Sequence, residues 1–408
     1  MVTYLNEALH TWNALTSMWR AEFSFPLTTQ TWWYDLTQVP NTLRPLTFTT
    51  TALINEMEYM LLEPASVPPS WTGSAQFQLS DLTGAIQRRR DETLNNTGCQ
   101  ISRSLVAATA GRTYLPDNLI DLRRVAYIPA APGTPITLAS TDIRAKYAYN
   151  PLWTVSTQTI GTYMQSTQPP LSFDVDYPPA PGGQYEVLTV NAGSAVTGVP
   201  VELLGIPDDW AWVVKYGALA DLLNRESNSK DAQRAAYCNV RYQMGLKLLQ
   251  FAPALLGARI NNVPVSYGPL RSGDDYSPTW QALPPGPPDR VYVAGLNLLG
   301  TSQVDAFGTY TALVEVVQNA PVTVNPTDNV QVSRQDYDAV LDLAQHLAAF
   351  KMGGAEFQAT LPLWERFLTQ AAVYNKKLLE LGQYTRALYE TSSDQERRDP
   401  REEVEQDA

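Results

Sequence analysis

The stretch IPDDWAWVVKYGALADLLNRESNSKDAQRAAYCNVRYQMGLKLLQ (206–250) has the pattern of two helices joined by a polar turn. Apolar residues recur at spacings of three and four, which places them on one face of each helix. The first face carries Val213, Tyr216, Ala220 and Leu223, and the second carries Ala235, Cys238, Tyr242, Gly245 and Leu249. Asp208 and Asp209 stand where a helix N-terminus favours a capping carboxylate. The stretch therefore predicts a helical hairpin.

The same period predicts further helices near 3–19, 50–63, 81–96 and 334–390. Ser333 and Asp336 form a capping-box pattern at the start of the last of these, and Gly353 and Gly354 interrupt it. Two other regions are rich in Val, Ile, Thr and Tyr and are broken by PAAPGTP (129–135), PPAPGG (178–183) and PPGPPD (284–289). This composition is typical of short strands. We expect an α+β fold, a helical bundle with two inserted β-rich regions.

The patterns divide the chain into six segments. These are an N-terminal helical part (1–98), a β-rich insertion (99–205), a helical hairpin (206–250), a second β-rich or loop region (251–333), a C-terminal helical hairpin (334–390) and an acidic tail (391–408). VVKYGALADLL (213–223) resembles VLDLAQHLAAF (340–350), and a strand-like region precedes each. An internal duplication of a β-plus-hairpin unit would explain this match, but shared amphipathic periodicity alone would produce much of it.

Charge and cysteine content narrow the class of protein. The 408 residues carry a net charge of −12, and the tail 391–408 contributes seven acids against three arginines. Because tight binding to nucleic acid requires basic residues that displace counterions, sequence-specific DNA binding is not expected. Cys99 and Cys238 are too few for a disulfide framework. The chain has no apolar run of about 18 residues and no signal-peptide pattern, so we expect a soluble protein of the cytosol with no membrane contact.

Catalytic patterns are sparse. The two histidines, His10 and His346, lie in predicted amphipathic helices, and the motifs of serine hydrolases, zinc peptidases and nucleotide-binding loops do not occur. Asp174, Asp176 and Glu186 could join a calcium site, although a solvated loop edge explains them as well. We expect no enzymatic activity, no cofactor and no metal site. A hydrolase that uses acidic residues is the less favoured alternative, because linear spacing cannot show two carboxylates across a cleft.

The densest basic run is Arg88–Arg90. Over 81–124, seven arginines face five acids, a local excess of 7 − 5 = +2 in an acidic chain. Consecutive helix positions point in different directions, so only part of the run can face one partner. The run is either a solvated face paired with Asp91 and Glu92, or a cationic patch that docks on an acidic neighbouring subunit. In a chain with no visible catalytic machinery, the ten tryptophans favour subunit interfaces, although a large core would also absorb them.

Four stretches resemble the neck proteins that join head and tail in tailed bacteriophages. They are SAQFQLSDLTGAIQRRRDETLNNTGC (74–99), AGRTYLPDNLIDLRRVAYIP (110–129), IPDDWAWVVKYGALADLLNRES (206–227) and DLAQHLAAFKMGGAEFQATLPLWERFLTQAAVYNKKL (342–378). The resemblance implies a connector or adaptor, made in the bacterial host cytoplasm, that assembles in the virion as a ring of about twelve copies. The ring would join the portal to tail and neck proteins and let genome DNA pass without sequence-specific binding.

Several residues are candidates for contacts between subunits or with neck neighbours. They are Arg88, Arg89, Arg90, Arg123, Arg124, Trp364 and Arg366. The tail 391–408 has Val404 as its only large apolar residue, so we expect it to pack poorly within its own subunit. A β-rich surface module that recognises a receptor or a glycan is the alternative from another functional class. It predicts a shallow aromatic site, whereas the connector hypothesis predicts self-assembly.

Overall fold

The computed structural model describes residues 2–38, 46–61, 77–109, 111–130, 134–149, 160–166, 171–199, 201–225, 230–276, 279–323, 325 and 328–377. The chain forms two compact units. Unit 1 combines Met1–Ser17 with Pro321–Ala408, and unit 2 is Met18–Ala320. Helices and β-sheets both occur, so the predicted α+β class is confirmed. The predicted acidic tail lies outside the described residues.

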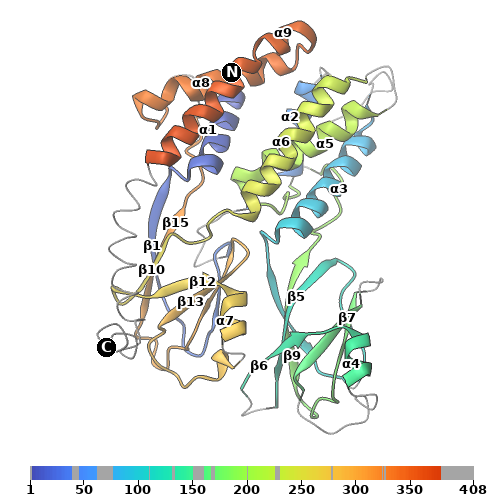
Figure 1. Ribbon diagram of the computed structural model, residues 1–408, viewed down its shortest axis with the longest axis vertical. Coiled ribbons are helices and arrows are strands. Elements are labelled where there is room, and N and C mark those ends of the chain that lie inside the picture. Colours follow the sequence, from blue (N-terminus) through green and yellow to red (C-terminus); the bar gives the residue numbers. More distant parts are fainter. Residues whose placement is uncertain are drawn as a thin grey trace, which may run out of the picture. The chain divides into compact units, whose positions relative to one another are not determined.

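The four longest described helices of unit 2 are α2 (Thr50–Met60), α3 (Leu79–Thr97), α5 (Ala211–Asn224) and α6 (Ala232–Gln250) (Figure 1). Helix α5 packs against each of the other three and is buried along nearly its whole length. Two glycines allow the close approach of α5 and α6. A Cβ atom at Gly245 would lie 2.6 Å from Val213, and one at Gly217 would lie 2.9 Å from Tyr242. The hairpin predicted over 206–250 is therefore present.

The start of this hairpin differs from the prediction. A 3-10 turn (Asp208–Trp210) precedes α5, and neither aspartate caps the helix with its side chain. Asp208 accepts the backbone N–H of Phe48 at 2.8 Å, and Asp209 accepts that of Ala320 at 3.0 Å. The two carboxylates satisfy backbone donors that are distant in sequence, which local pattern cannot reveal.

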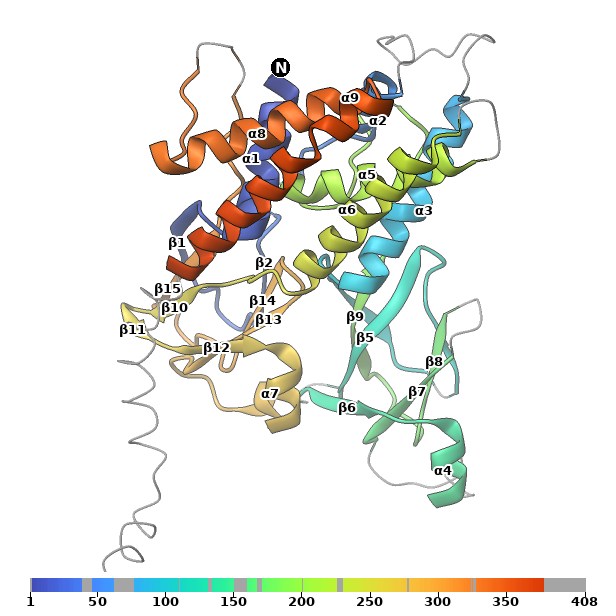
Figure 2. The same ribbon diagram turned by 45° about the horizontal axis from the view of Figure 1, so that its top comes forward.

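The strands that the structure describes between residues 102 and 191 form one seven-stranded sheet. Its order is β3 (Ser102–Ala107), β9 (Gln184–Asn191), β5 (Leu119–Ile128), β6 (Ile136–Ser140), β7 (Thr162–Ser166), β8 (Ser172–Val175) and β4 (Thr113–Tyr114). Phe173 on β8 and Tyr185 on β9 are four strand positions apart, which would separate them by about 19 Å in a flat sheet. Their ring centroids are 5.1 Å apart, so the sheet curls around a core of its own. The short helix α4 (Ile143–Tyr149) lies beside β7 (Figure 2).

The remaining described strands of unit 2 form two four-stranded sheets. One has the order β1 (Arg20–Pro26), β15 (Thr311–Val317), β10 (Gly257–Ile260) and β11 (Val263–Pro264), and the other has β12 (Ser266–Pro269), β13 (Arg290–Ala294), β14 (Leu298–Thr301) and β2 (Trp33–Asp35). Both sheets contribute to a single core, in which Phe25 and Tyr34 have ring centroids 5.4 Å apart. Helix α7 (Leu270–Tyr276) and a 3-10 turn (Trp280–Ala282) lie between β12 and β13.

Unit 1 is helical in its described part. It contains α1 (Val2–Thr16), α8 (Arg334–Phe350), α9 (Gly354–Ala359) and a further helical segment, 361–377. Trp12 of α1 packs with Phe367 and Tyr374 of the last segment, at 5.7 Å between centroids in each case. The helix starting at 334 is present as predicted, although the Ser333 hydroxyl donates to the Asp336 carboxylate at 2.7 Å and caps no backbone group.

The helices are distributed over both units, whereas we expected one bundle. The internal duplication is not confirmed either. Strands β10–β15 belong to unit 2, and α8, the helix that follows them, belongs to unit 1. The second β-plus-hairpin segment therefore does not form a compact body of its own.

Candidate functional site: an arginine and carboxylate groove between α3 and α5

The arginine run of α3 points in three directions, as a helix requires. The side chain of Arg88 is 69% exposed, that of Arg89 is 20% exposed and that of Arg90 is 1% exposed. Arg88 and Arg89 face α5, whereas Arg90 is buried next to Gly193 and pairs with Asp91 at 3.0 Å. Only two of the three residues can therefore share one site.

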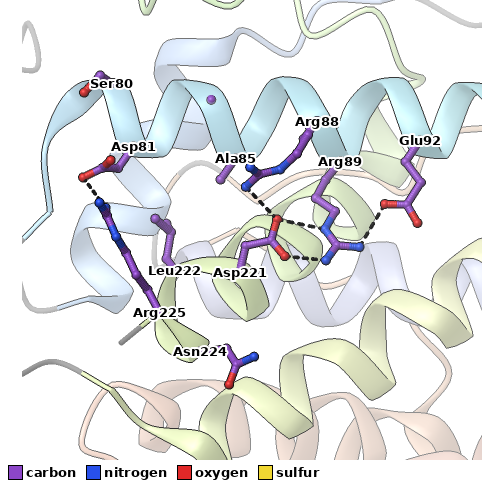
Figure 3. Close-up of a pocket in the computed structure, with 11 residues that line it drawn as sticks. Ser80, Asp81, Ala85, Arg88, Arg89, Glu92, Asp221, Leu222, Asn224 and Arg225 are labelled. Carbon is purple, nitrogen blue, oxygen red and sulfur yellow. Dashed lines mark hydrogen bonds and ion pairs between the residues drawn. The ribbon is translucent and has the colours of Figure 1, made fainter. Parts of the chain in front are cut away.

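Arg88 and Arg89 line a groove of about 690 Å³ between α3 and the end of α5 (Figure 3). Polar and charged side chains dominate its walls. The lining residues are Ser80, Asp81, Gly84, Ala85, Arg88, Arg89, Glu92, Asp221, Leu222, Asn224 and Arg225. Figure 3 shows both arginines directed at Asp221 of α5, and Arg225 directed at Asp81 near the start of α3.

Asp221 is the centre of the groove. It accepts hydrogen bonds from Arg88 Nη2 at 3.0 Å and from Arg89 Nε at 3.1 Å, and it also pairs with Arg89 Nη2. Arg89 continues to Glu92 at 2.9 Å, and its guanidinium lies 4.9 Å from the ring centroid of Tyr242. The hydrogen bond with Asp221 raises the pKa of Arg89, so its charge is permanent. Arg89 is thus fixed from three sides.

Arg88 and Arg225 occupy the exposed positions. Arg88 uses one of its five N–H groups on Asp221. Arg225 is 56% exposed and pairs with Asp81 at 2.7 Å. Asp81 also accepts the backbone N–H of Gln78, the residue that precedes α3. Helix α3 therefore begins at Leu79, two residues before the predicted start.

The groove has the chemistry of a recognition surface. Among the lining residues that the structure describes, three arginines face three carboxylates, those of Asp81, Glu92 and Asp221, so charges of the two signs alternate. The described lining contains no histidine that could act as a base for the Ser80 hydroxyl, and no cysteine that could act as a nucleophile itself. Fixed, alternating charges with unused donors suit the polar surface of another protein.

A second arginine cluster is buried inside unit 2. Arg124 of β5 is 4% exposed, and Glu186 of β9 is 1% exposed. Arg124 donates to Glu186 at 3.1 Å and to Asp274 at 2.9 Å, and its guanidinium lies 5.7 and 5.6 Å from the ring centroids of Trp33 and Trp280. The cluster joins the seven-stranded sheet to β2 and to the segment after β12.

Glu186 has further donors. Arg103 donates to Glu186 Oε2 at 2.8 Å, while Trp33 Nε1 and Gln281 Nε2 each donate to Oε1 at 3.1 Å. A buried charge is tolerated only when it is paired and fully hydrogen-bonded. Arg124 and Glu186 satisfy that condition, which makes the cluster a structural joint of unit 2.

The other predicted interface residues are dispersed. Arg123 is 41% exposed, pairs with Asp121 at 3.0 Å and donates to the carbonyl of Asn95 at the end of α3. Trp364 is buried in unit 1, stacked with His346 and Phe367. Arg366 is 65% exposed and pairs with Asp342 of α8 at 2.9 Å. The structure brings together Arg88 and Arg89 alone; Arg90, Arg124 and Trp364 lie inside the chain's own cores.

The expectation that the tryptophans mark subunit interfaces is wrong for Trp33, Trp210, Trp212 and Trp280, which are buried. Trp210 and Trp212 are 6% and 4% exposed and stack on each other at 6.4 Å. Trp33 packs edge-on against Trp280 at 5.8 Å. These aromatic residues fill cores, so their abundance is not an argument for interfaces.

The calcium hypothesis fails on geometry. Asp174 pairs with Arg112, Asp176 pairs with Lys146, and Glu186 belongs to the Arg124 cluster. Each carboxylate therefore has a different cation as its partner. Within the described ranges, no group of three or more His, Cys, Asp or Glu residues could hold a metal ion.

His346 has the structural role that its place in an amphipathic helix favours. It is fully buried, its ring stacks on Phe357 with centroids 4.9 Å apart, and its Nδ1 is 2.9 Å from the hydroxyl of Thr360. His10 lies half-exposed on α1.

Sequence reasoning missed the partners that define both clusters. Asp221 and Arg225 lie more than a hundred residues from Arg88, and the only local signal was the polar end of the first hairpin helix. Trp33 and Gln281 meet Glu186 from distances of 153 and 95 residues. These contacts between distant residues do not change the apolar periodicity of the segments that carry them, so periodicity cannot predict them.

No protein-family model and no curated protein sequence matches this chain. Among the helices of the described ranges, none combines the length and the apolar character needed to cross a bilayer.

Proposed function

We propose that this chain is a structural protein without catalytic activity that assembles with copies of itself in the head–tail neck of a tailed bacteriophage. The observation that carries the proposal is the groove between α3 and α5. There Arg88 is 69% exposed and shares Asp221 with Arg89. Charges that are fixed in position and only partly paired are suited to guide the encounter and register of two protein surfaces.

The charge balance of the groove favours a protein partner. A site for a free anion would carry an excess of positive charge, whereas here each arginine already faces a carboxylate. A partner surface can instead bind the unused N–H groups of Arg88 and the second oxygen of Glu92 at the same time. We therefore assign the groove to contacts between subunits.

The neck setting comes from the resemblance of the four stretches to connector and adaptor proteins. In that setting, a ring of this chain would join the portal to the tail and neck proteins, and genome DNA would pass through its opening. The net charge of −12 would repel phosphates and let the duplex slide. Such adaptors combine helical bundles with β insertions, and helical segments alternate with two β-rich regions along this chain.

The setting is tested on particles of the phage whose genome encodes the chain. Mass spectrometry of purified virions should find the protein in a copy number like that of the other neck proteins. Antibodies against the chain should label the junction of head and tail in electron micrographs. Absence from the virion, or a label at the distal end of the tail, would contradict the neck assignment.

A further inference from the structure

The charges of the groove between α3 and α5 differ in their exposure to solvent. The side chains of Arg88 and Arg225 are 69% and 56% exposed, whereas those of their partners Asp221 and Asp81 are 21% and 26% exposed. A guanidinium has five N–H donors, and each of these two arginines uses only part of its set on the carboxylate that it contacts. A molecule that approaches the groove from solvent therefore meets cationic groups with donors still available.

Helix geometry sets the spacing of these exposed charges along α3. Positions 81 and 88 are almost two turns apart, so they share one face of the helix and lie about 10 Å apart along its axis. Asp81 holds Arg225 at the first position, and Arg88 occupies the second. Glu92 follows one turn later, about 6 Å further along the axis, and its side chain is 40% exposed. The groove thus presents two cations and then one anion in a fixed order.

The tail 391–408 carries charges in a complementary order. It has seven acids and three arginines, and Val404 is its only large apolar residue, so charge is its main means of binding a protein surface. An extended chain advances about 3.3 Å per residue, so acids three residues apart match the spacing of the two cations of the groove. Glu396 precedes Asp399 by three residues, and Glu402 follows it by three.

Asp399 is the central charge of the tail for either direction of binding. When it faces Arg88, an acid three residues away faces the other exposed arginine of the groove. An arginine two residues from Asp399 on its other side then meets Glu92. This arginine is Arg401 for one direction of the tail and Arg397 for the opposite direction. The order of charges in the tail therefore matches the groove without a choice of direction.

We propose that the groove of each copy binds the C-terminal tail of a neighbouring copy, with Asp399 paired to Arg88. This inference rests on the self-assembly proposed above and names the segment that fills the groove. Residues 378–398 separate the last described residue from Asp399 and can span up to about 70 Å, which is long enough to reach an adjacent subunit. One tail and one groove in each copy generate a head-to-tail contact, which closes into a ring when the rotation between copies allows it.

Charge exchange tests the pair in the full-length chain. In sedimentation at low salt, Arg88→Glu and Asp399→Arg should each weaken association about 3- to 10-fold, because each places like charges together. The double variant should return to within about twofold of the wild type, since it restores an ion pair of reversed polarity. Asp407→Arg is the matched control, because it changes the charge of the tail equally at a distant position. Combined with Arg88→Glu, it should restore nothing.

Disulfide trapping shows which copy supplies the tail. A chain with Arg88→Cys is mixed with a chain with Asp399→Cys, and the two native cysteines stay in place because both are buried. Mild oxidation should give mixed dimers in preference to dimers of either variant alone. A chain with both substitutions should give dimers, trimers and longer species. Arg112→Cys replaces Arg88→Cys in the matched control, since Arg112 is also an exposed, aspartate-paired arginine, and it should give no mixed dimer.

Four results would overturn the inference. A doubly substituted chain that oxidises only within itself would show that each copy binds its own tail, and equal trapping by Arg112→Cys would show that the tail has no preferred site. A wild-type chain that assembles while neither cross-linking nor charge exchange depends on Asp399 would show that the tail takes no part. These three results leave the proposed function intact. A wild-type chain that stays monomeric at every concentration would overturn both.

Discussion

The Arg124 cluster and the groove at Arg88 are built from the same groups, guanidinium and carboxylate, and differ in their access to water. Arg124 is 4% exposed and is held by two carboxylates and two tryptophan rings. Arg88 is 69% exposed and has a single described partner, Asp221. Both arginines come from the same arginine-rich span, 88–124.

Because of this difference in exposure to water, we expect the two arginine clusters to affect different properties of the protein, its folding stability and its association. A buried pair that loses one member leaves an uncompensated charge in a medium of low polarity, which is strongly unfavourable. An exposed pair is solvated and screened, so its loss has little effect on folding. The buried cluster should therefore control the stability of unit 2, and the groove should control association. Each of the following variants tests one side of this contrast.

The largest effect is expected for Arg124→Ala. The change removes the cation that Glu186 and Asp274 share but leaves Arg103 on Glu186, so we expect the free energy of unfolding to fall by about 3 kcal/mol. Urea denaturation followed by tryptophan fluorescence measures it. A loss below about 1 kcal/mol for Arg124→Ala would show that the cluster is not a structural joint.

A smaller effect is expected for Arg90→Ala, the buried neighbour of Arg88. Arg90 is 1% exposed, but its partner Asp91 is 29% exposed and can be hydrated once the arginine is gone. The expected loss is about 1–3 kcal/mol, mostly from packing and one charged hydrogen bond. Simultaneous replacement of Arg88, Arg89 and Arg90 by Glu is therefore no clean test of an interface, because it also introduces a buried carboxylate. Equal unfolding midpoints for wild type and Arg90→Ala would contradict the role of Arg90 as a buried, stabilising residue.

The pair Asp231–Arg234 is less buried than Arg124 and more buried than Arg88. Its contribution to the free energy of unfolding should depend on pH. Burial acts to raise the pKa of Asp231, but hydrogen bonds from the backbone and side chain of Arg234 outweigh it and lower the pKa below its ordinary value. The carboxylate caps α6, and its stabilisation is complete above the pKa of the unfolded chain and is lost as the pH falls through the folded pKa. Asp231→Ala should cost about 1 kcal/mol near neutral pH.

The same variant should approach the wild type as the pH falls from 6 towards 3, when both chains lack the charged cap. Thermal unfolding at several pH values measures the difference between the two. Asp231→Asn serves as control, because asparagine caps a helix without ionising. A difference that grows on acidification would have the wrong sign and would contradict the account.

The smallest effect on stability, below about 1 kcal/mol, is expected for Arg88→Glu. The substitution places a negative charge beside Asp221 on the exposed wall of the groove, so association should slow while the unfolding midpoint hardly moves. Stopped-flow light scattering at low and high salt measures the rate. Arg112→Glu is a matched control, since the side chain of Arg112 is 46% exposed and also pairs with one aspartate. Equal rates for the two variants would remove the groove from assembly.

The sequence predicted those parts of the fold that depend on local periodicity. The hairpin of α5 and α6 followed from two apolar stripes and a polar turn, and the fan of Arg88–Arg90 followed from helix geometry. Local patterns do not predict which distant segments pair. Strand β1 pairs with β15 across nearly three hundred residues, and the sequence of neither strand indicates that the other is its partner.

The same limit explains the errors at the site. The arginines of the span 88–124 look alike in sequence, yet Arg124 is buried because Trp33, Glu186 and Trp280 converge on it from three distant segments. Trp364 sits in a helical pattern in which exposed and buried positions are distinguished only by the packing of α8 and α9. Burial is a property of tertiary contacts, and it decides which arginine can serve an interface.

Self-assembly is the central claim, and the native mass of the full-length wild-type chain tests it most directly. Native mass spectrometry across a range of protein concentrations, with sedimentation as a check, should find a closed ring of about twelve copies in equilibrium with the monomer. Arg88→Glu should shift that equilibrium towards the monomer, while Arg112→Glu should leave it in place. A single species at the monomer mass at every concentration would contradict the account.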